Sequence, residues 1–409
     1  MTPVINRRLA IVPTFLLFIA ASLGLHIAAD VGPPLPPEAA PGQPPVVSPV
    51  ATPPAPASAP ANQLPPRPQP PDNTIKTSGS LTPSQMTKID SFVGDSVKRL
   101  VEGTDAQTVA DSRSDLISGA ASPNPQTPAS DPYLTEYITR LAKYLGPKLA
   151  QGSLNQRVNC GIVLARVAEN AVAAQVGVSL QPLHQLIITE MRDPSQAIAL
   201  WGMKAAAVAI TSASGAPSQQ VLNEVIPCVQ KHGYNGPITD AAYNALSDPT
   251  NPQVIAAVMR IYKERTGLYI NGIPSEPSVD RKAASHLTTG SGMWGKMTQP
   301  QQDQVMNLIR ENLDAATKAI EAADVSPDQV NDLRILIIET CKAVVVAAEV
   351  RNQPALRFDA KHAADLSESS QPSEVATRAA PVIAGLLAAF PSGNAGSGAG
   401  ANPAAVANH

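Results

Sequence analysis

The sequence predicts an all-α protein, and three observations lead to this fold class. Apolar residues recur at three- and four-residue spacing through most of the chain after residue 80, which is the period of an amphipathic helix. A capping residue followed by proline stands at the start of several of these segments. No segment shows the alternation of polar and apolar residues that is typical of a half-buried strand, apart from a short unpaired run at 267–273.

Composition narrows the class of protein further. The chain has 409 residues and 41 prolines, only 3% of its residues are aromatic, and its alanine content favours helices that approach one another closely. A net charge of −3 offers no basic footprint for nucleic acid. The three cysteines are Cys160, Cys228 and Cys341. Their wide spacing predicts buried small apolar residues and neither a disulfide framework nor a metal site.

Residues 1–29 predict export. Arg7 and Arg8 precede an uncharged segment of 21 residues, 9–29, which is long enough to span a bilayer and is also organised like a secretory signal. Cleavage after Ala29 and retention as a membrane anchor remain equally open, and a twin-arginine signal is a minor alternative. We therefore expect the rest of the chain to be periplasmic or otherwise in the cell envelope, secreted, or anchored to the membrane by residues 9–29.

Residues 30–80 and 391–409 are predicted to be disordered. Seventeen prolines fall between residues 33 and 71, and each removes a backbone donor and fixes its own φ, so this linker cannot form helix or sheet. It is expected to act as an extended spacer. The final segment is rich in Gly and Ala and is expected to be a disordered tail.

Residues 81–390 are predicted to form a helical domain. Five of its helices are expected to start at a capping residue followed by proline, and three of these starts carry Gln where a capping box requires it. The five starts are Thr82-Pro83, Asp131-Pro132, Asp193-Pro194, Asn251-Pro252 and Ser326-Pro327.

The region 155–232 has the clearest organisation, because long apolar helices are each followed by a shorter one. The first opens near Asn155 and the next at Pro194, which is a period near 40 residues and is the mark of a stack of antiparallel helix pairs, an α-solenoid.

This region resembles HEAT-type repeats. Arg157-Val158-Asn159-Cys160 followed by Leu164-Ala165-Arg166 looks like the opening of a HEAT helix, and Asp193-Pro194-Ser195 looks like the turn before the next one. The sequence departs from the family pattern at Gln156 and Ala199. The resemblance covers 155–232 and extends more weakly to residue 268. It implies a surface that binds other proteins and has no catalytic residues of its own.

The segment Gly290–Lys296 fits the spacing of a phosphate-binding loop, but its surroundings do not. Residues 281–289 are polar and unlike the buried strand that such a loop follows, and Met297 stands where Ser or Thr would hold magnesium. We therefore interpret the segment as a flexible glycine loop and keep nucleotide binding as an alternative.

The remaining candidate residues favour a structural interpretation. Asp359, His362 and Asp365 can share one helix face, but they lack a fourth ligand and a metal-site spacing. Trp201 is expected to fill the core. Three histidines, His184, His232 and His286, have no acidic partner at a spacing that suggests a general base. No catalytic, cofactor-binding or metal-binding residue is predicted. The expected function is a protein-interaction scaffold; a passive wall or surface spacer is the second possibility.

Overall fold

The computed structural model describes residues 64–174, 177–211, 219–248, 251–289, 293–322, 324–367 and 369–391. The chain divides into two units, Met1–Ala61 and Asn62–His409, and every described element belongs to the second. The predicted apolar segment 9–29, most of the predicted linker and the tail after residue 391 lie outside the described residues. None of the described helices is both long and apolar enough to cross a membrane.

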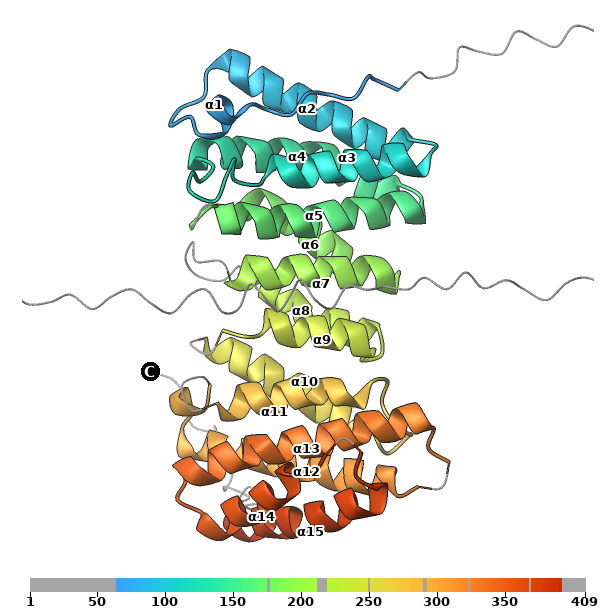
Figure 1. Ribbon diagram of the computed structural model, residues 1–409, viewed down its shortest axis with the longest axis vertical. Helices are drawn as coiled ribbons and strands as arrows, with labels where there is room; N and C mark the ends of the chain where they lie inside the picture. The colour runs from blue at the N-terminus through green and yellow to red at the C-terminus, as the bar shows by residue number, and fades with distance from the viewer. Residues whose placement is uncertain are drawn as a thin grey trace, which may run out of the picture. The chain divides into compact units, whose positions relative to one another are not determined.

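The described part of the chain is all-helical and contains no strand, only an isolated bridge between Asn124 and Thr127 (Figure 1). The fold class predicted from the sequence is confirmed at this level. The α-helices are α1 (Asn73–Lys76), α2 (Pro83–Glu102), α3 (Ala106–Gly119), α4 (Asp131–Gln151), α5 (Leu154–Ala174), α6 (His184–Met191), α7 (Gln196–Thr211), α8 (Gln219–Lys231), α9 (Gly236–Ala245), α10 (Pro252–Leu268), α11 (Asp280–Thr288), α12 (Gln299–Ile320), α13 (Pro327–Val350), α14 (Pro354–Ala364) and α15 (Pro372–Ala389).

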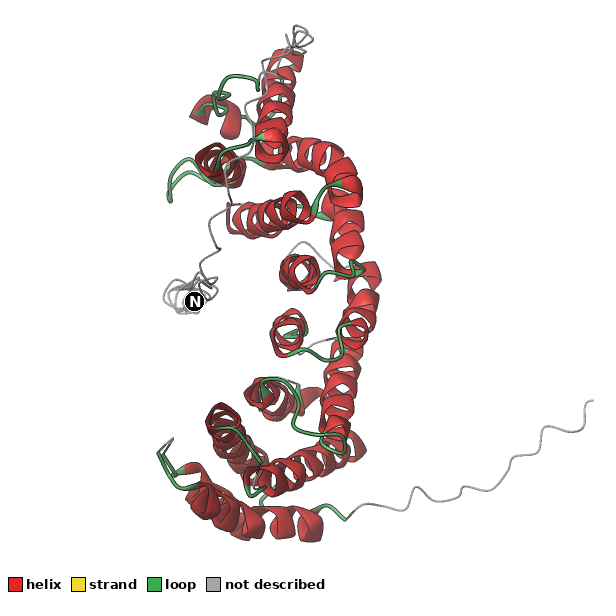
Figure 2. Cartoon of the chain, turned by 90° about the vertical axis from the view of Figure 1, so that its right-hand side faces the viewer, coloured by secondary structure: helices red, strands yellow, loops and turns green. Residues whose placement is uncertain are grey.

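The helices contact one another in two series within Asn62–His409. In what we call the odd row, α3, α5, α7, α9, α11 and α13 each pack on the next (Figures 1 and 2). In the even row, α2, α4, α6, α8, α10 and α12 do the same. The short helix α6 lies mainly against α7, the long helix that follows it, and α14 and α15 pack on α12 and α13.

Local capping sets several of the helix starts. Thr82 begins α2 as predicted: its hydroxyl accepts a hydrogen bond from the Gln85 backbone N–H at 3.3 Å, and the Gln85 side chain accepts one from the Thr82 N–H at 2.8 Å. Ser326 and Gln329 form the same box at α13. At α4 the cap is Ser130 and Asp131 is the first helical residue, so the helix begins one residue earlier than predicted.

The helix start predicted at Asp193-Pro194 is wrong by two residues, because α7 begins at Gln196. Asp193 serves another purpose: its carboxylate forms an ion pair with Arg157 of α5 and accepts a hydrogen bond from the Ser195 N–H at 2.8 Å. The side chain thus joins the turn before α7 to the preceding helix of the odd row.

Small residues allow α6 and α7 to approach closely. A Cβ at Gly202 would lie 2.7 Å from the Glu190 Cβ and 2.8 Å from the Met191 backbone nitrogen. Four buried alanines of α7 add to the same short side-chain layer: Ala199, Ala205, Ala206 and Ala209. The alanine-rich composition therefore serves the close helix packing that it predicted.

Residues 64–80 pack on the helices, so the folded part begins before Leu81 and the predicted linker boundary at residue 80 is wrong. Ile75 is buried, and Asp72 caps the short helix α1. The ammonium group of Lys76 donates to the carbonyl oxygen of Ser118, in the last turn of α3, at 2.9 Å. It also donates to the carbonyl oxygen of Ala121, just after the helix, at 3.2 Å. Proline content alone hid these specific contacts, which depend on partners more than 40 residues away.

Candidate functional site

The exposed side of the odd row carries a connected set of polar and aromatic side chains. We call it the odd-row face and define it by Arg166 of α5, Trp201 and Lys204 of α7, Asp240 of α9 and Lys282 of α11. All five are partly exposed, whereas the neighbouring positions on the same helices belong to the core. The odd-row face is therefore a partly exposed surface to which α5, α7, α9 and α11 all contribute.

Trp201 is the centre of this face. The Lys204 Nζ lies 4.3 Å from the ring centroid, and the Arg166 guanidinium carbon lies 5.8 Å from it. Both positions are within the range of a cation–π interaction. Arg166 also pairs with Glu169 at 2.7 Å, and burial together with the charge of Arg166 lowers the pKa of Lys204.

The expectation that Trp201 fills the core is met only in part. Trp201 packs against the core and is partly exposed at the surface. Sequence reasoning missed the cluster because Arg166 stands 35 positions earlier, on a different helix. A lysine three residues after a tryptophan on one helix was the only local signal.

Asp240 continues the face from α7 towards α11. Its carboxylate accepts from the Lys282 ammonium at 2.6 Å, and Lys282 also donates to the Asn244 side-chain oxygen at 3.1 Å. These contacts tie α9 to α11 through exposed side chains. Because exposed ion pairs are worth only ~0–1 kcal/mol, these contacts contribute little to stability.

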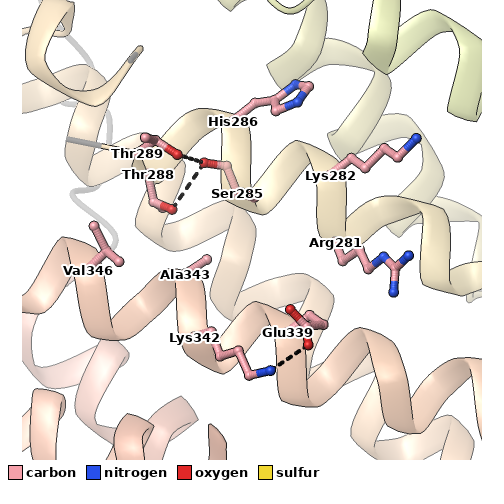
Figure 3. Close-up of a pocket in the computed structure, with 10 residues that line it drawn as sticks. All are labelled: Arg281, Lys282, Ser285, His286, Thr288, Thr289, Glu339, Lys342, Ala343 and Val346. Atoms are coloured by element: carbon pink, nitrogen blue, oxygen red, sulfur yellow. Dashed lines mark hydrogen bonds and ion pairs between the residues drawn. The ribbon is translucent and has the colours of Figure 1, made fainter. Parts of the chain in front are cut away.

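A pocket opens between α11 and α13, next to Lys282, with a volume of about 310 Å³. Figure 3 shows α11 along one side and α13 along the other. The lining residues are Arg281, Lys282, Ser285, His286, Thr288, Thr289, Glu339, Lys342, Ala343 and Val346. The pocket was not predicted, because it arises from the meeting of two helices 40 residues apart, and α11 itself was interpreted only as a polar stretch.

Some of the charged side chains that line the pocket have ion-pair partners, and one has none among the described residues. Lys342 pairs with Glu339 of its own helix at 2.6 Å, and Lys282 is held by Asp240. Arg281 is exposed and forms no ion pair with any described residue. Burial lowers the pKa of His286, whose Nδ1 is buried without a hydrogen-bond partner in the described structure. The pocket therefore combines a free guanidinium with a neutral imidazole.

The segment Gly290–Lys296 is described only from Met293 onward. Helix α11 precedes it, and the 3-10 helix Trp294–Lys296 follows with Trp294 buried. The next helix, α12, has its first turn closed by a capping box between Thr298 and Gln301. The described part of the segment lacks the strand–loop–helix geometry of a phosphate-binding loop.

The other candidates occupy positions without reactive surroundings. The guanidinium of Arg378 donates to the Nε2 of His362, and no group of metal ligands forms among the described residues. His232 Nε2 lies 3.1 Å from the Asp193 carbonyl oxygen. The three cysteine thiols are buried, and burial raises the pKa of each to about 12.

Comparison with known proteins identifies no family. No family model matches the sequence, and neither does any curated protein. Among solved structures the chain is similar to two crystal structures of engineered proteins from the Northeast Structural Genomics Consortium. The first is 12% identical with a TM-score of 0.33, over 77% of this chain and 82% of that chain. The second is 13% identical with a TM-score of 0.26, over 72% of this chain and 96% of that chain. At these TM-scores neither likeness supports a shared fold.

Proposed function

We propose that the protein is a non-catalytic protein-interaction scaffold whose helices form a solenoid-like stack of the HEAT type. The neighbour-to-neighbour contacts within the two rows support the stack. So does the spacing of the odd row, in which α5, α7 and α9 begin at residues 154, 196 and 236, close to the period of about 40 residues typical of such repeats.

The observation that carries the binding function is the partly exposed Trp201 between two cations. Tryptophan and arginine are enriched among the residues that dominate binding energy at protein interfaces. Here a rigid indole stands at the centre of a partly exposed face and is held in place by Lys204 and Arg166. A passive spacer, the second candidate from the sequence, has no need of such a group.

We further propose that the scaffold works outside the cytoplasm, at the cell envelope. This rests on the basic, then apolar, start of the chain and on the proline-rich segment after it. The N-terminal residue of the protein isolated from its host, determined by mass spectrometry, tests the proposal. A start at Asp30 indicates a cleaved signal, an intact Met1 in membrane fractions indicates an anchor, and an intact Met1 in the soluble cytoplasm contradicts export.

The binding proposal is tested by crosslinking and capture with the full chain. Trp201→Ala is compared with Phe358→Ala, an aromatic control because Phe358 is 72% exposed on α14 and lies outside the odd-row face. We expect at least one protein that the wild type and the Phe358 variant capture to be lost with the Trp201 variant. Equal capture by both variants, with unchanged folding, contradicts the proposal.

A further inference from the structure

The pocket between α11 and α13 has two chemically different ends. In Figure 3 the cationic residues Arg281 and Lys282 lie towards one end, and Val346 and Thr289 lie towards the other. Val346 is 42% exposed, and the buried Ala343 adjoins it on α13. A ligand that fills the pocket therefore meets positive charge at one end and an aliphatic surface at the other.

One cationic group of the pocket lining has no ion-pair partner among the described residues. Lys282 pairs with Asp240 and Lys342 pairs with Glu339, which leaves the positive charge of Arg281 uncompensated. Arg281 supplies the planar donor group that suits a carboxylate, since its guanidinium has no ion pair among the described residues. The pocket thus complements an anion.

The same features distinguish between classes of anion. Glu339 stands among the cations and would repel a densely charged phosphate group, while it can accept a hydrogen bond from a peptide N–H. The exposed Val346 offers apolar area to an aliphatic side chain and nothing to a free inorganic ion. A volume of about 310 Å³ also lies at the small end of ligand pockets, which suits a short segment.

We propose that the α11–α13 pocket binds a short acidic segment of a partner protein, in which a carboxylate side chain meets Arg281 and a neighbouring small aliphatic side chain contacts Val346. The inference rests on the proposed scaffold function and names the chemistry of the partner. It places a specific contact next to the odd-row face, since Lys282 belongs to both.

Fluorescence anisotropy with the full chain tests the pocket directly. The probe is a fluorescein-labelled synthetic peptide of alternating Glu and Ala, compared with one of alternating Gln and Ala and one of alternating Glu and Gly. We expect the Glu–Ala peptide to bind about tenfold more tightly than the Gln–Ala peptide and several-fold more tightly than the Glu–Gly peptide, with affinity falling as salt rises.

Charge reversal separates the pocket from general electrostatics. Arg281→Glu is expected to weaken binding of the Glu–Ala peptide by about tenfold. Lys318→Glu is the control for a charge reversal outside the pocket, because the Lys318 side chain is 73% exposed on α12 and does not line the pocket. Circular dichroism and the melting temperature confirm that both variants are folded.

Three outcomes overturn the inference: equal binding of the Glu–Ala and Gln–Ala peptides, equal loss in the Arg281 and Lys318 variants, and displacement by inorganic phosphate at lower concentration than by unlabelled Glu–Ala peptide. The last outcome would assign the pocket to phosphate. None of the three affects the scaffold proposal, which depends on capture through Trp201. If the Trp201 and Phe358 variants captured the same proteins while the Glu–Ala peptide still bound, the pocket would remain a peptide site without the proposed scaffold function.

Discussion

Two places in the helical unit bury a carboxyl group completely, and they treat it in opposite ways. Asp280, at the start of α11, accepts hydrogen bonds from the Arg265 Nε at 2.7 Å and from the Tyr243 hydroxyl at 3.0 Å. Glu190, on α6, lies between Gly161 and Gly202, and neither of its oxygens has a hydrogen-bond partner in the described structure. One carboxyl has a partner cation, and the other has none.

The difference shows what burial of a charge does to the surrounding packing. Arg265 extends its contacts to the carbonyl oxygens of Tyr234, Ser275 and Glu276, so the ion pair joins α9, α10 and α11 in one arrangement. For Glu190 the dominant effect is desolvation, reinforced by the charge of Asp193, which raises its pKa well above the usual range. The first site holds α9, α10 and α11 in one arrangement, although it buries two charges. The second site makes the free energy of unfolding depend on pH.

The largest effect is expected from Arg265→Met, which removes the cation and leaves Asp280 buried without compensation. We expect the free energy of unfolding, measured by urea denaturation, to fall by about 3–5 kcal/mol. Arg260→Met is the control, since Arg260 pairs with Glu264 on the exposed side of the same helix and should matter by less than about 0.5 kcal/mol. Similar losses in both variants would show that the buried pair is not special.

Gly202→Ala tests the close packing beside Glu190. The added Cβ would lie 2.8 Å from the Met191 backbone nitrogen, so α6 or α7 must shift. A loss of about 1–3 kcal/mol is expected from this overpacking. In contrast, a Cβ at Gly267 meets nothing within 4 Å, and Gly267→Ala should stabilise α10 by up to about 1 kcal/mol. An unchanged free energy of unfolding in the Gly202 variant would mean that α6 and α7 can move apart without loss of stability.

Glu190→Gln should make the protein more stable at neutral pH. The folded-state pKa is raised above the unfolded value, so the folded carboxyl keeps a proton that the unfolded chain releases. The contribution of the Glu190 carboxyl to the free energy of unfolding is therefore fully present below pH about 4.5. It is lost as the pH rises through the folded pKa.

The Gln variant cannot ionise, so its advantage should be near zero at pH 4 and about 1–3 kcal/mol at pH 8. Urea denaturation at several pH values measures it. Glu374→Gln, with its side chain 46% exposed, provides the reference. A pH-independent difference between the Glu190 variant and wild type would contradict the assignment.

The smallest effect concerns the cysteines. Burial raises the pKa of Cys160, Cys228 and Cys341 to about 12, so their thiolates are scarce at pH 8. We expect no reaction of the folded protein with Ellman's reagent, and reaction of all three thiols after unfolding in guanidinium chloride. Rapid labelling of any one thiol in the folded protein would reveal local opening of its helix.

The sequence was informative where structure is decided locally. The capping box at Thr82 and the one at Ser326 depend on residues three positions apart, and both were predicted correctly. The start at Asp131 was wrong by one residue, since Ser130 is also a good cap and nothing in the pattern chooses between them. All-helical architecture followed from periodicity over long segments, which tolerates such local errors.

Features that depend on distant residues were missed. Asp193 was interpreted as a cap, whereas its partner Arg157 lies on the previous odd-row helix. The cations around Trp201 and the pocket beside Arg281 were missed for the same reason. Each site combines residues from two helices, and the sequence does not show which residues of the two helices lie side by side. A helical pattern predicts which residues face outward, but it does not determine which of them become neighbours.

The final two helices determine where the array of helices ends. α15 lies on α12 and α13, and its buried residues Val375, Val382 and Leu386 cover apolar surface that a further pair of helices would otherwise occupy. These two helices therefore occupy the place of a further pair, while Phe358 of α14 and Leu387 of α15 remain exposed on them. A chain truncated after α13 would expose that apolar surface, and its self-association would follow from the loss of a terminal cover.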